Sequence, residues 1–341
     1  MAAVSSIRLA LALAAVLAAS LCGCGGRKAS PTGANLSPGQ QRAAAVNGAD
    51  DLPGSKPAKG AYDPAVVRLQ VLLDRARFSP GVINGRLDED VRRGLVAYEQ
   101  AHGFPADGKL SRPVWASLTM ADPKPAIMAH RIDADDIAGP FTPEIPKDFP
   151  AMARLEHLGY RDAAEELAEA FHMDVALLRA LNPKARFVPG ETVLVAARGD
   201  DDLRVDLGRI EVDHGAGLVR AYDAMGRLLA AYPASVGSRS CPAFTGAVQV
   251  VSIDPQPSYS YDSDSLGVAG FSRGRTEIAP GPNNPIGVVW INLSRDGYGI
   301  HGAPDAESVG GPSPHGCVRL TNWDARELAR GVKPGTPVTF K

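Results

Sequence analysis

Apolar residues recur at helical spacing in three short segments between residues 61 and 120, namely 66–73, 91–98 and 114–118. An apolar position every three or four residues is typical of an amphipathic helix with one buried face. Pairs that favour turns separate the segments at Pro80-Gly81, Asn84-Gly85 and Asp107-Gly108. The pattern therefore predicts a compact bundle of three helices.

A second apolar pattern, between residues 151 and 197, mixes helix and strand. Helices are expected around 161–171 and at 175–181, and the second ends before Pro183 because proline cannot continue a helix. Residues 192–195 favour a short strand. We therefore expect a small α+β module, preceded by an irregular, proline-rich linker over residues 121–150.

Strand patterns dominate residues 203–341. The expected strands are 210–212, 218–222, 228–236, 248–251 and 288–293, with glycine turns between the first three. One helix is expected near the end, since Thr321 and Asp324 form a start like a capping box and Gly331 suits its end. The pattern predicts a mainly β domain, a curved sheet or sandwich with one helix.

The N-terminus carries an export pattern. Arg8 precedes an apolar run at residues 9–21, which is too short for a comfortable membrane span. Residues 1–24 are therefore expected to be a signal segment. Residues 25–60 are rich in small and polar residues and have few large apolar side chains. Such a segment cannot bury enough surface to offset its ordering entropy, so we expect a flexible tether.

Length and charge limit the class of protein. The 341 residues suggest two or three domains. Acidic and basic residues nearly balance at a formal net charge of -2, which gives no reason to expect a nucleic acid partner. The sequence therefore predicts a multidomain chain of a three-helix bundle, an α+β module and a mainly β domain.

Candidate chemistry gathers near the C-terminus, around Cys317. A cysteine attacks as its thiolate, and an ordinary thiol with a pKa of about 8.5 is mostly protonated at neutral pH. His301 lies across a loop from Cys317 and can return beside it from a neighbouring strand, so we assign it as the base in preference to His315. Backbone amides near Gly316 and Cys317 can form an oxyanion hole. Arg319 suits a substrate carboxylate.

A zinc site is the alternative for the same residues. Two histidines and one cysteine are common zinc ligands. No fourth ligand with zinc-like spacing is evident in the sequence. We therefore favour the catalytic interpretation and expect no metal and no cofactor.

At these residues the sequence resembles the L,D-transpeptidases with a YkuD-type catalytic domain. The likeness rests on His301 and on His315-Gly316-Cys317-Val318-Arg319, with Pro314 where the family has Ser or Thr. Residues 280–287 and 321–325 also resemble segments found in this family. The resemblance implies a YkuD-like fold and a Cys317 nucleophile.

The same resemblance implies further roles for residues near the cysteine. The carbonyl of Gly302 would orient His301, so that no acidic third member is needed. His315 and Arg319 would contact the substrate, and Tyr298 and Trp290 would line or support the cleft.

Two upstream segments resemble wall-binding modules. The helices and Gly turns of residues 61–120 look like a type 1 peptidoglycan-binding domain. Residues 151–197 resemble a LysM domain, although Leu158-Gly159-Tyr160-Arg161-Asp162 replaces the usual opening strand. Either glycan binding or a degenerate module that packs on the catalytic domain remains open.

The end of the signal segment resembles a bacterial lipobox. Cys24 fits best as the lipidated residue and Cys22 is the poorer alternative, while an ordinary secretory signal without lipid stays open. The resemblance implies a periplasmic protein of the cell envelope, anchored to the outer membrane by lipid.

The expected function is a peptidoglycan L,D-transpeptidase that forms 3-3 cross-links through a Cys317 thioester, with peptidoglycan stem peptides and glycan as partners. Attachment of a protein to the wall remains open, as does an L,D-carboxypeptidase, or a hydrolase that releases a wall-linked lipoprotein, with the same Cys-His pair. A non-catalytic anchor between outer membrane and wall is the alternative of another class. A regulatory disulfide between Cys241 and Cys317 is a further hypothesis.

Overall fold

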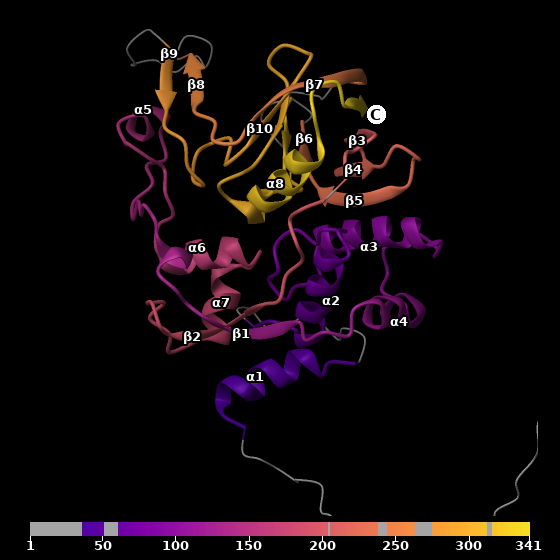
Figure 1. Ribbon diagram of the computed structural model, residues 1–341, viewed down its shortest axis with the longest axis vertical. Helices are drawn as coiled ribbons and strands as arrows, with labels where there is room; N and C mark the ends of the chain where they lie inside the picture. Colours follow the sequence, from indigo (N-terminus) through magenta and orange to yellow (C-terminus); the bar gives the residue numbers. More distant parts are fainter. Residues whose placement is uncertain (1–35, 51–60, 204, 238–243, 263–274, 312–315) are drawn as a thin grey trace, which may run out of the picture. The chain divides into compact units, whose positions relative to one another are not determined.

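Figure 1 shows the computed structural model of the chain, which describes residues 36–50, 61–203, 205–237, 244–262, 275–311 and 316–341. Residues 37–341 form one compact unit. Among the described residues, no helix has both the length and the apolar character needed to cross a membrane. The expected signal segment and Cys24 lie outside the described residues.

Residues 38–47 correct the expectation of a flexible tether over residues 25–60. They form helix α1 (Pro38–Asn47), which starts with a capping box between Ser37 and Gln40. Val46 is fully buried in the core of the α+β module. Asn47 exchanges two hydrogen bonds with the backbone of Ile127, at 2.9 and 2.8 Å. A short helix with one buried valine gains its stability from this docking, which composition does not reveal.

The predicted three-helix bundle is confirmed. Its helices are α2 (Pro64–Arg75), α3 (Glu89–His102) and α4 (Arg112–Ala121). The side chains of Asp63, Asp88 and Ser111 accept hydrogen bonds from the first turns, as N-caps do. The apolar faces meet in one cluster that includes Leu69, Leu73, Leu95, Tyr98 and Trp115.

The α+β module is built from two strands and two helices. Strands β1 (Ile127–Arg131) and β2 (Thr192–Ala196) pair antiparallel, and helices α6 (Ala163–Ala170) and α7 (Val175–Leu181) lie between them in sequence. The expectation that residues 121–150 are wholly irregular is wrong, because β1 falls there. The segment between β1 and α6 adds a 3-10 turn, η1 (Asp135–Ile137), and the short helix α5 (Phe149–Met152).

In the described part of residues 203–341, one nine-stranded sheet has the order β5-β4-β3-β13-β7-β10-β11-β12-β6. The first strands in sequence are β3 (Arg209–Asp213), β4 (Leu218–Tyr222), β5 (Leu228–Pro233), β6 (Ser235–Val236) and β7 (Gly246–Asp254). The later strands are β10 (Trp290–Leu293), β11 (Gly299–His301), β12 (Val318–Arg319) and β13 (Pro337–Phe340). Strands β8 (Tyr259–Asp262) and β9 (Arg275–Ile278) form a separate hairpin. Since β5 and β6 are nearly contiguous yet lie at opposite ends of the order, the sheet curves back on itself, as predicted.

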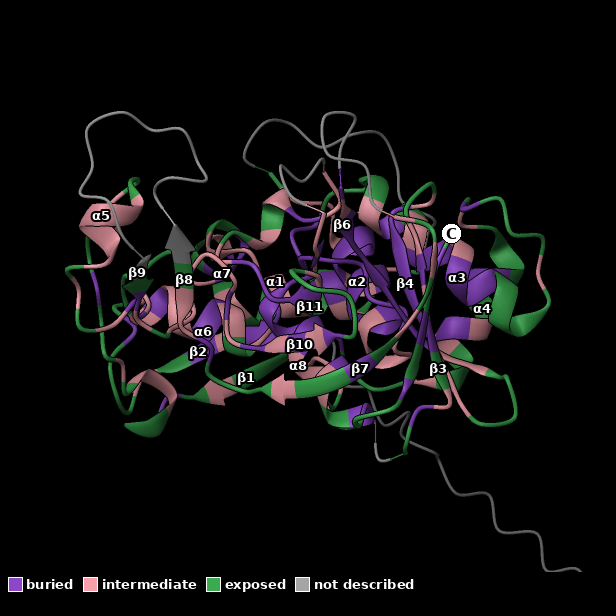
Figure 2. Ribbon diagram, turned by 90° about the horizontal axis from the view of Figure 1, so that it is seen from above, coloured by how far each residue is buried: buried purple, intermediate pink, exposed green. Residues whose placement is uncertain are grey.

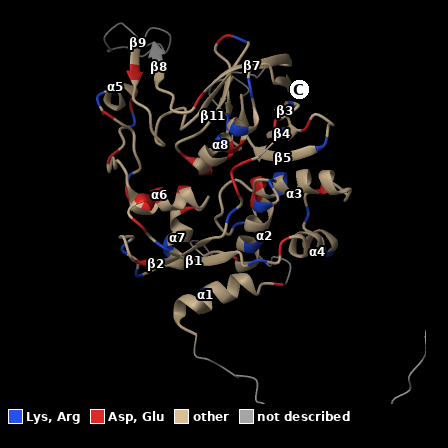
Figure 3. Cartoon of the chain, in the orientation of Figure 1, with Lys and Arg blue, Asp and Glu red and all other residues tan. Residues whose placement is uncertain are grey.

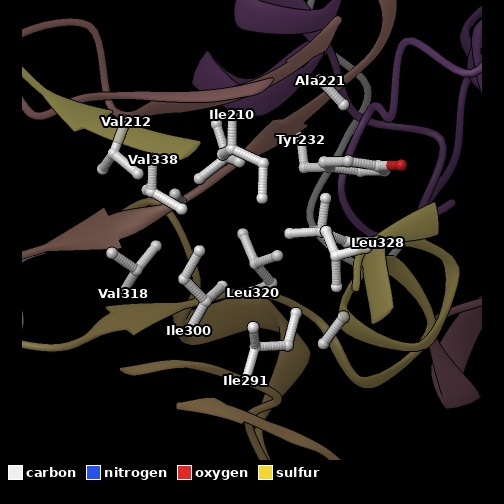
Figure 4. Packing of buried hydrophobic residues seen from close by; sticks show 14 of the residues in the cluster. Ile210, Val212, Ala221, Tyr232, Ile291, Ile300, Val318, Leu320, Leu328 and Val338 are labelled. Carbon is white, nitrogen blue, oxygen red and sulfur yellow. The ribbon is translucent and has the colours of Figure 1, made fainter. Parts of the chain in front are cut away.

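The core of this domain lies inside the curved sheet. Figure 4 shows Ile210, Val212 and Val338 facing Ile300 and Val318 across it. Helix α8 (Asn322–Gly331) adds Leu328 to the same cluster, and the Thr321 side chain caps it by accepting from the Asp324 N–H, as predicted. In Figure 2 strand β4 is accordingly coloured as buried, whereas β7 is mostly exposed or intermediate. The remaining short element is η2 (Ala306–Ser308).

Backbone hydrogen bonds join the bundle to the β domain. Ser79 donates to the carbonyl of Ala231 and Ala231 donates to that of Arg77, both at 2.9 Å. The segment after α2 thus pairs with the edge strand β5 and covers groups that an open edge would expose.

Buried charges lie where the three parts meet, and acidic and basic residues stand close together near α8 in Figure 3. The His172 ring contacts Asp74 through Nδ1 at 2.8 Å and Asp201 through Nε2 at 3.3 Å. The same ring stacks on Trp323 of α8, with centroids 5.1 Å apart. Ser79 donates to the Asp324 carboxyl at 2.9 Å. His172 therefore links the α+β module to the bundle and to α8.

The protonation of His172 makes this junction sensitive to pH. Burial alone would lower the pKa of His172, but the charges of Asp74 and Asp201 and the bonds to them outweigh burial and raise that pKa to about 9. Burial also raises the pKa of Glu327 to about 7 despite its ion pair with Arg77, and raises that of Asp324 well above its usual range. Contacts through both ring nitrogens favour the imidazolium form, in which both are donors.

We predict that alkaline pH weakens the junction. A histidine whose pKa rises on folding stabilises the fold fully below the unfolded value of about 6.5, and this contribution disappears as pH rises through about 9. The contribution is about 3 kcal/mol. We expect the melting temperature to fall between pH 6.5 and 9, and His172→Gln to be less stable at pH 6 with a flatter profile. His214→Gln, in an exposed turn, serves as the control. Parallel profiles for His172→Gln and the unaltered chain would contradict the prediction.

Candidate active site

Four side chains form a row across neighbouring strands of the curved sheet. Trp290 pairs with His301, His301 with Arg319, and Arg319 with Ser235. Paired residues share a face of the sheet, and the next residue along each strand points to the opposite face. The next pairs, Ile291 with Ile300 and Val318 with Val236, belong to or pack on the core. The row therefore lies on the face that points away from the core.

The imidazole of His301 is held in one orientation. Its Nδ1 lies 2.7 Å from the carbonyl oxygen of Gly302. Since a carbonyl only accepts, Nδ1 carries the proton and Nε2 presents its lone pair. The ring is 5% exposed and stacks on Trp290, with centroids 5.4 Å apart. The ring is thus fixed by a hydrogen bond on one edge and an aromatic face beside it.

Cys317 stands directly before β12 and is half-buried. It lies in a bend of the backbone, two residues before Arg319, which pairs with His301. Its thiol donates to the carbonyl of Gly297 at 3.4 Å. The parallel pairing of β11 and β12 thus makes neighbours of the backbone segments that carry His301 and Cys317, although fifteen residues separate the two in sequence.

Gly316 passes close to an aromatic wall. A Cβ at Gly316 would lie 3.0 Å from the ring carbon Cε1 and from the hydroxyl of Tyr298. Tyr298 in turn packs edge-on against Phe244, and the Arg295 guanidinium lies over both rings. Tyr298 therefore lies against the backbone just before Cys317.

Arg319 belongs to the row and is half-buried. It donates to the Ser308 hydroxyl at 3.2 Å. Burial lowers the pKa of Arg319, and the nearby charge of Asp305 opposes that shift. The guanidinium thus ties the loop after His301 to the strand that follows Cys317.

Several predicted residues lie outside the described residues, namely His315, Cys24 and Cys241. The described residues contain no group of three or more His, Cys, Asp or Glu side chains arranged to hold a metal ion. The zinc alternative required His315 as a third ligand.

Three residues near the site have no role in the sequence analysis. Tyr259 of β8 lies near Cys317, since burial and then the charge of Cys317 raise the pKa of Tyr259. Asn322 fills a slot beside Gly302, where a Cβ would lie 2.3 Å from its Oδ1. Glu169 of α6 accepts from the Asn322 amide at 2.8 Å. Of these three residues, only Asn322 lies close to Cys317 in sequence, and this is the one signal that could have indicated a role near the site.

Two family models match the chain. Residues 208–340 match the YkuD model, described as an L,D-transpeptidase catalytic domain. Residues 62–118 match the model of a peptidoglycan binding domain. Both matches fall on segments for which the sequence resemblance implied the same families, and neither covers the α+β module.

Curated relatives carry L,D-transpeptidase names. The chain is 43% identical over 61 residues to YkuD of Bacillus licheniformis, a match that covers 18% of this chain and 37% of that protein. It is 28% identical over 181 residues to YkuD of Bacillus subtilis (strain 168), covering 52% of this chain and 93% of that protein.

Solved structures of L,D-transpeptidases also match. That from Mycobacterium smegmatis has a TM-score of 0.31 at 19% identity, over 45% of this chain and 64% of the other. The catalytic domain from Enterococcus faecium acylated by ertapenem has a TM-score of 0.32 at 20% identity, over 40% and 98%. The family models and curated relatives identify residues 208–340 as an L,D-transpeptidase catalytic domain, preceded by a peptidoglycan-binding domain at residues 62–118.

Proposed function

We propose that this protein is a peptidoglycan L,D-transpeptidase that forms 3-3 cross-links through an acyl-enzyme on Cys317. The observation that carries the proposal is the parallel pairing of β11, which ends at His301, with β12, which begins directly after Cys317. The Gly302 carbonyl fixes the imidazole so that Nε2 can accept a proton. A cysteine with an oriented imidazole is an activated nucleophile for acyl transfer.

In the first half-reaction, Nε2 of His301 takes the thiol proton and the sulfur attacks the carbonyl carbon between diaminopimelate and D-Ala. Backbone amides near Gly316 and Cys317 stabilise the oxyanion. Collapse breaks the carbon–nitrogen bond, and His301 returns its proton to the leaving amine of D-Ala. A thioester on Cys317 remains.

In the second half-reaction, an amine from another stem peptide attacks the thioester. His301 accepts the proton of that amine, the carbon–sulfur bond breaks, and the proton returns to the sulfur. One amide bond has replaced another, so no cofactor or external energy source is required. Water in place of the amine would give a carboxypeptidase.

Substrate contacts follow from the row beside the nucleophile. Arg319 has spare guanidinium donors for a stem carboxylate, beyond the one bonded to Ser308. Trp290, which stacks on His301, and Tyr298, which lies against Gly316, offer aromatic surfaces for the substrate, and His315 is proposed to contact it. The peptidoglycan-binding domain would hold the glycan and raise the local concentration of stems.

The two peptidoglycan-related domains indicate a protein of the cell envelope. We extend this to a periplasmic lipoprotein, anchored in the outer membrane through Cys24. The apolar run at residues 9–21 and the following Leu21-Cys22-Gly23-Cys24 support export and lipid attachment.

The function is tested with disaccharide tetrapeptides as both donor and acceptor. We predict that the purified chain yields a cross-linked dimer that lacks one D-Ala, detected by mass spectrometry of muropeptides. Cys317→Ala should abolish the product because it removes the nucleophile, with a loss of at least about a thousandfold. Tripeptide without dimer would point to hydrolysis, and equal product from Cys317→Ala would overturn the assignment of the nucleophile.

The Cys-His pair is tested without any peptide substrate. We predict that iodoacetamide alkylates Cys317 at pH 7 about tenfold faster in the unaltered chain than in His301→Ala, whose thiol should react like an ordinary one with a pKa of about 8.5. Mass spectrometry of the peptide that carries Cys317 separates it from the other cysteines. Identical rate profiles from pH 5 to 10 would rule out His301 as the base.

Lipid attachment is tested by cell fractionation in a Gram-negative host. We predict that the unaltered chain sediments with outer membranes and gains the mass of acyl chains at its N-terminus, whereas Cys24→Ser is soluble after export. Cys22→Ser is the matched control and should stay membrane-bound. Loss of anchoring in Cys22→Ser alone would assign the lipid to Cys22 instead.

A further inference from the structure

Asn322, the first residue of α8, fills a slot between two backbone segments of the candidate active site. Its side chain is 1% exposed, and its Oδ1 accepts from the Val288 N–H at 3.3 Å. A Cβ would lie 2.3 Å from this oxygen at Gly302 and 2.2 Å from it at Gly287. Glycine at both positions is what lets the amide of Asn322 enter the slot. The carbonyl of Gly302, which orients His301, therefore belongs to a segment that packs directly on Asn322.

The orientation of this amide is fixed from the α+β module. Its Nδ2 donates to Glu169 Oε2 at 2.8 Å and to the carbonyl of Pro282 at 3.1 Å. A carboxylate and a carbonyl accept, whereas the Val288 N–H donates, so the three contacts are satisfied in one orientation of the amide. Glu169 supplies the charged partner among them, from a position 153 residues earlier in the chain.

Glu169 is itself held in place on both sides. Its Oε1 accepts from Arg326 Nη2 at 2.7 Å and from the Tyr160 hydroxyl at 3.0 Å. Arg326 lies one turn beyond Asn322 on α8, so the carboxylate bridges two residues of the same helix. The side chain of Glu169 is 13% exposed. Its partly buried position strengthens these charge-assisted bonds relative to those of a surface pair.

We propose that Glu169 is a positioning residue for the Cys317-His301 pair, a proposal that rests on the proposed function. Without its carboxylate, the Nδ2 of Asn322 loses an acceptor in a buried slot, and the amide must shift to find another. The Val288 and Gly302 segments then lose the oxygen that they pack against. The bond from Gly302 to Nδ1 of His301 is weakened, and the imidazole is no longer held with Nε2 toward the thiol.

The α+β module thereby becomes part of the catalytic unit. Helix α6 contacts α8, and α8 contacts β11, which carries His301. The module holds the backbone behind the histidine, in addition to any glycan that it binds.

The experiment measures the pH dependence of Cys317 alkylation in the full chain. Glu169→Ala should lower the alkylation rate at pH 7 by about fivefold, part of the loss seen for His301→Ala, and should shift the rate profile toward higher pH. Glu169→Gln keeps the volume and an oxygen that can accept from Asn322, so it should recover part of the rate. The matched control is Glu166→Ala on the same helix, whose carboxylate accepts from the Gly139 N–H at 3.1 Å and should leave the profile unchanged.

Thermal unfolding and near-ultraviolet circular dichroism establish that each variant is folded. If Glu169→Ala and Glu169→Gln are both folded and both keep the pH profile of Cys317 alkylation of the unaltered chain, the role of Glu169 is overturned and the proposed function is not. A shift of equal size in Glu166→Ala would also overturn it, because the effect would then be a general one of the module. If the unaltered chain and His301→Ala share one profile, the proposed function itself fails, and the role of Glu169 with it.

Discussion

The hydrogen bond from His301 Nδ1 to the Gly302 carbonyl is the contact on which the rest of the site depends. In many nucleophile–histidine pairs a carboxylate orients the imidazole, and the side chain that carries it can be placed independently of the backbone. Here the acceptor belongs to the next residue, so the direction of the ring follows the path of the main chain. Anything that shifts the backbone at Gly302 therefore shifts the imidazole of His301.

That dependence explains why buried polar groups from distant segments collect behind the site. A carbonyl acceptor adds no negative charge beside the imidazole, so its effect comes from geometry rather than from strong electrostatics. Geometry of this kind requires rigid surroundings, and hydrogen-bonded polar side chains in a buried slot provide them. The same logic applies to Trp290, whose ring stacks on His301 and limits its rotation.

Local features of the structure could be predicted from the sequence, and contacts between distant segments could not. Helix α7 and the cap of α8 at Thr321 follow from signals within a few residues. The pairing of Cys317 with His301 is predicted from the loop between them and from the family resemblance, which marks both residues. Strand β1 was missed because its partner lies about 65 residues later, in β2. Helix α1 was missed because docking on the α+β module, rather than its own composition, stabilises it.

The sequence predicts modules that are joined by linkers, whereas in the structure these modules contact one another directly. A tethered wall-binding domain would search for glycan independently of the enzyme. In this structure the segment after α2 instead extends the sheet at β5, and His172 stacks on Trp323 one residue after Asn322. Ala231 and Trp323, which make these contacts, lie four residues from Ser235 and Arg319 of the row, respectively. The bundle and the α+β module therefore pack directly on the β domain instead of moving independently on flexible linkers.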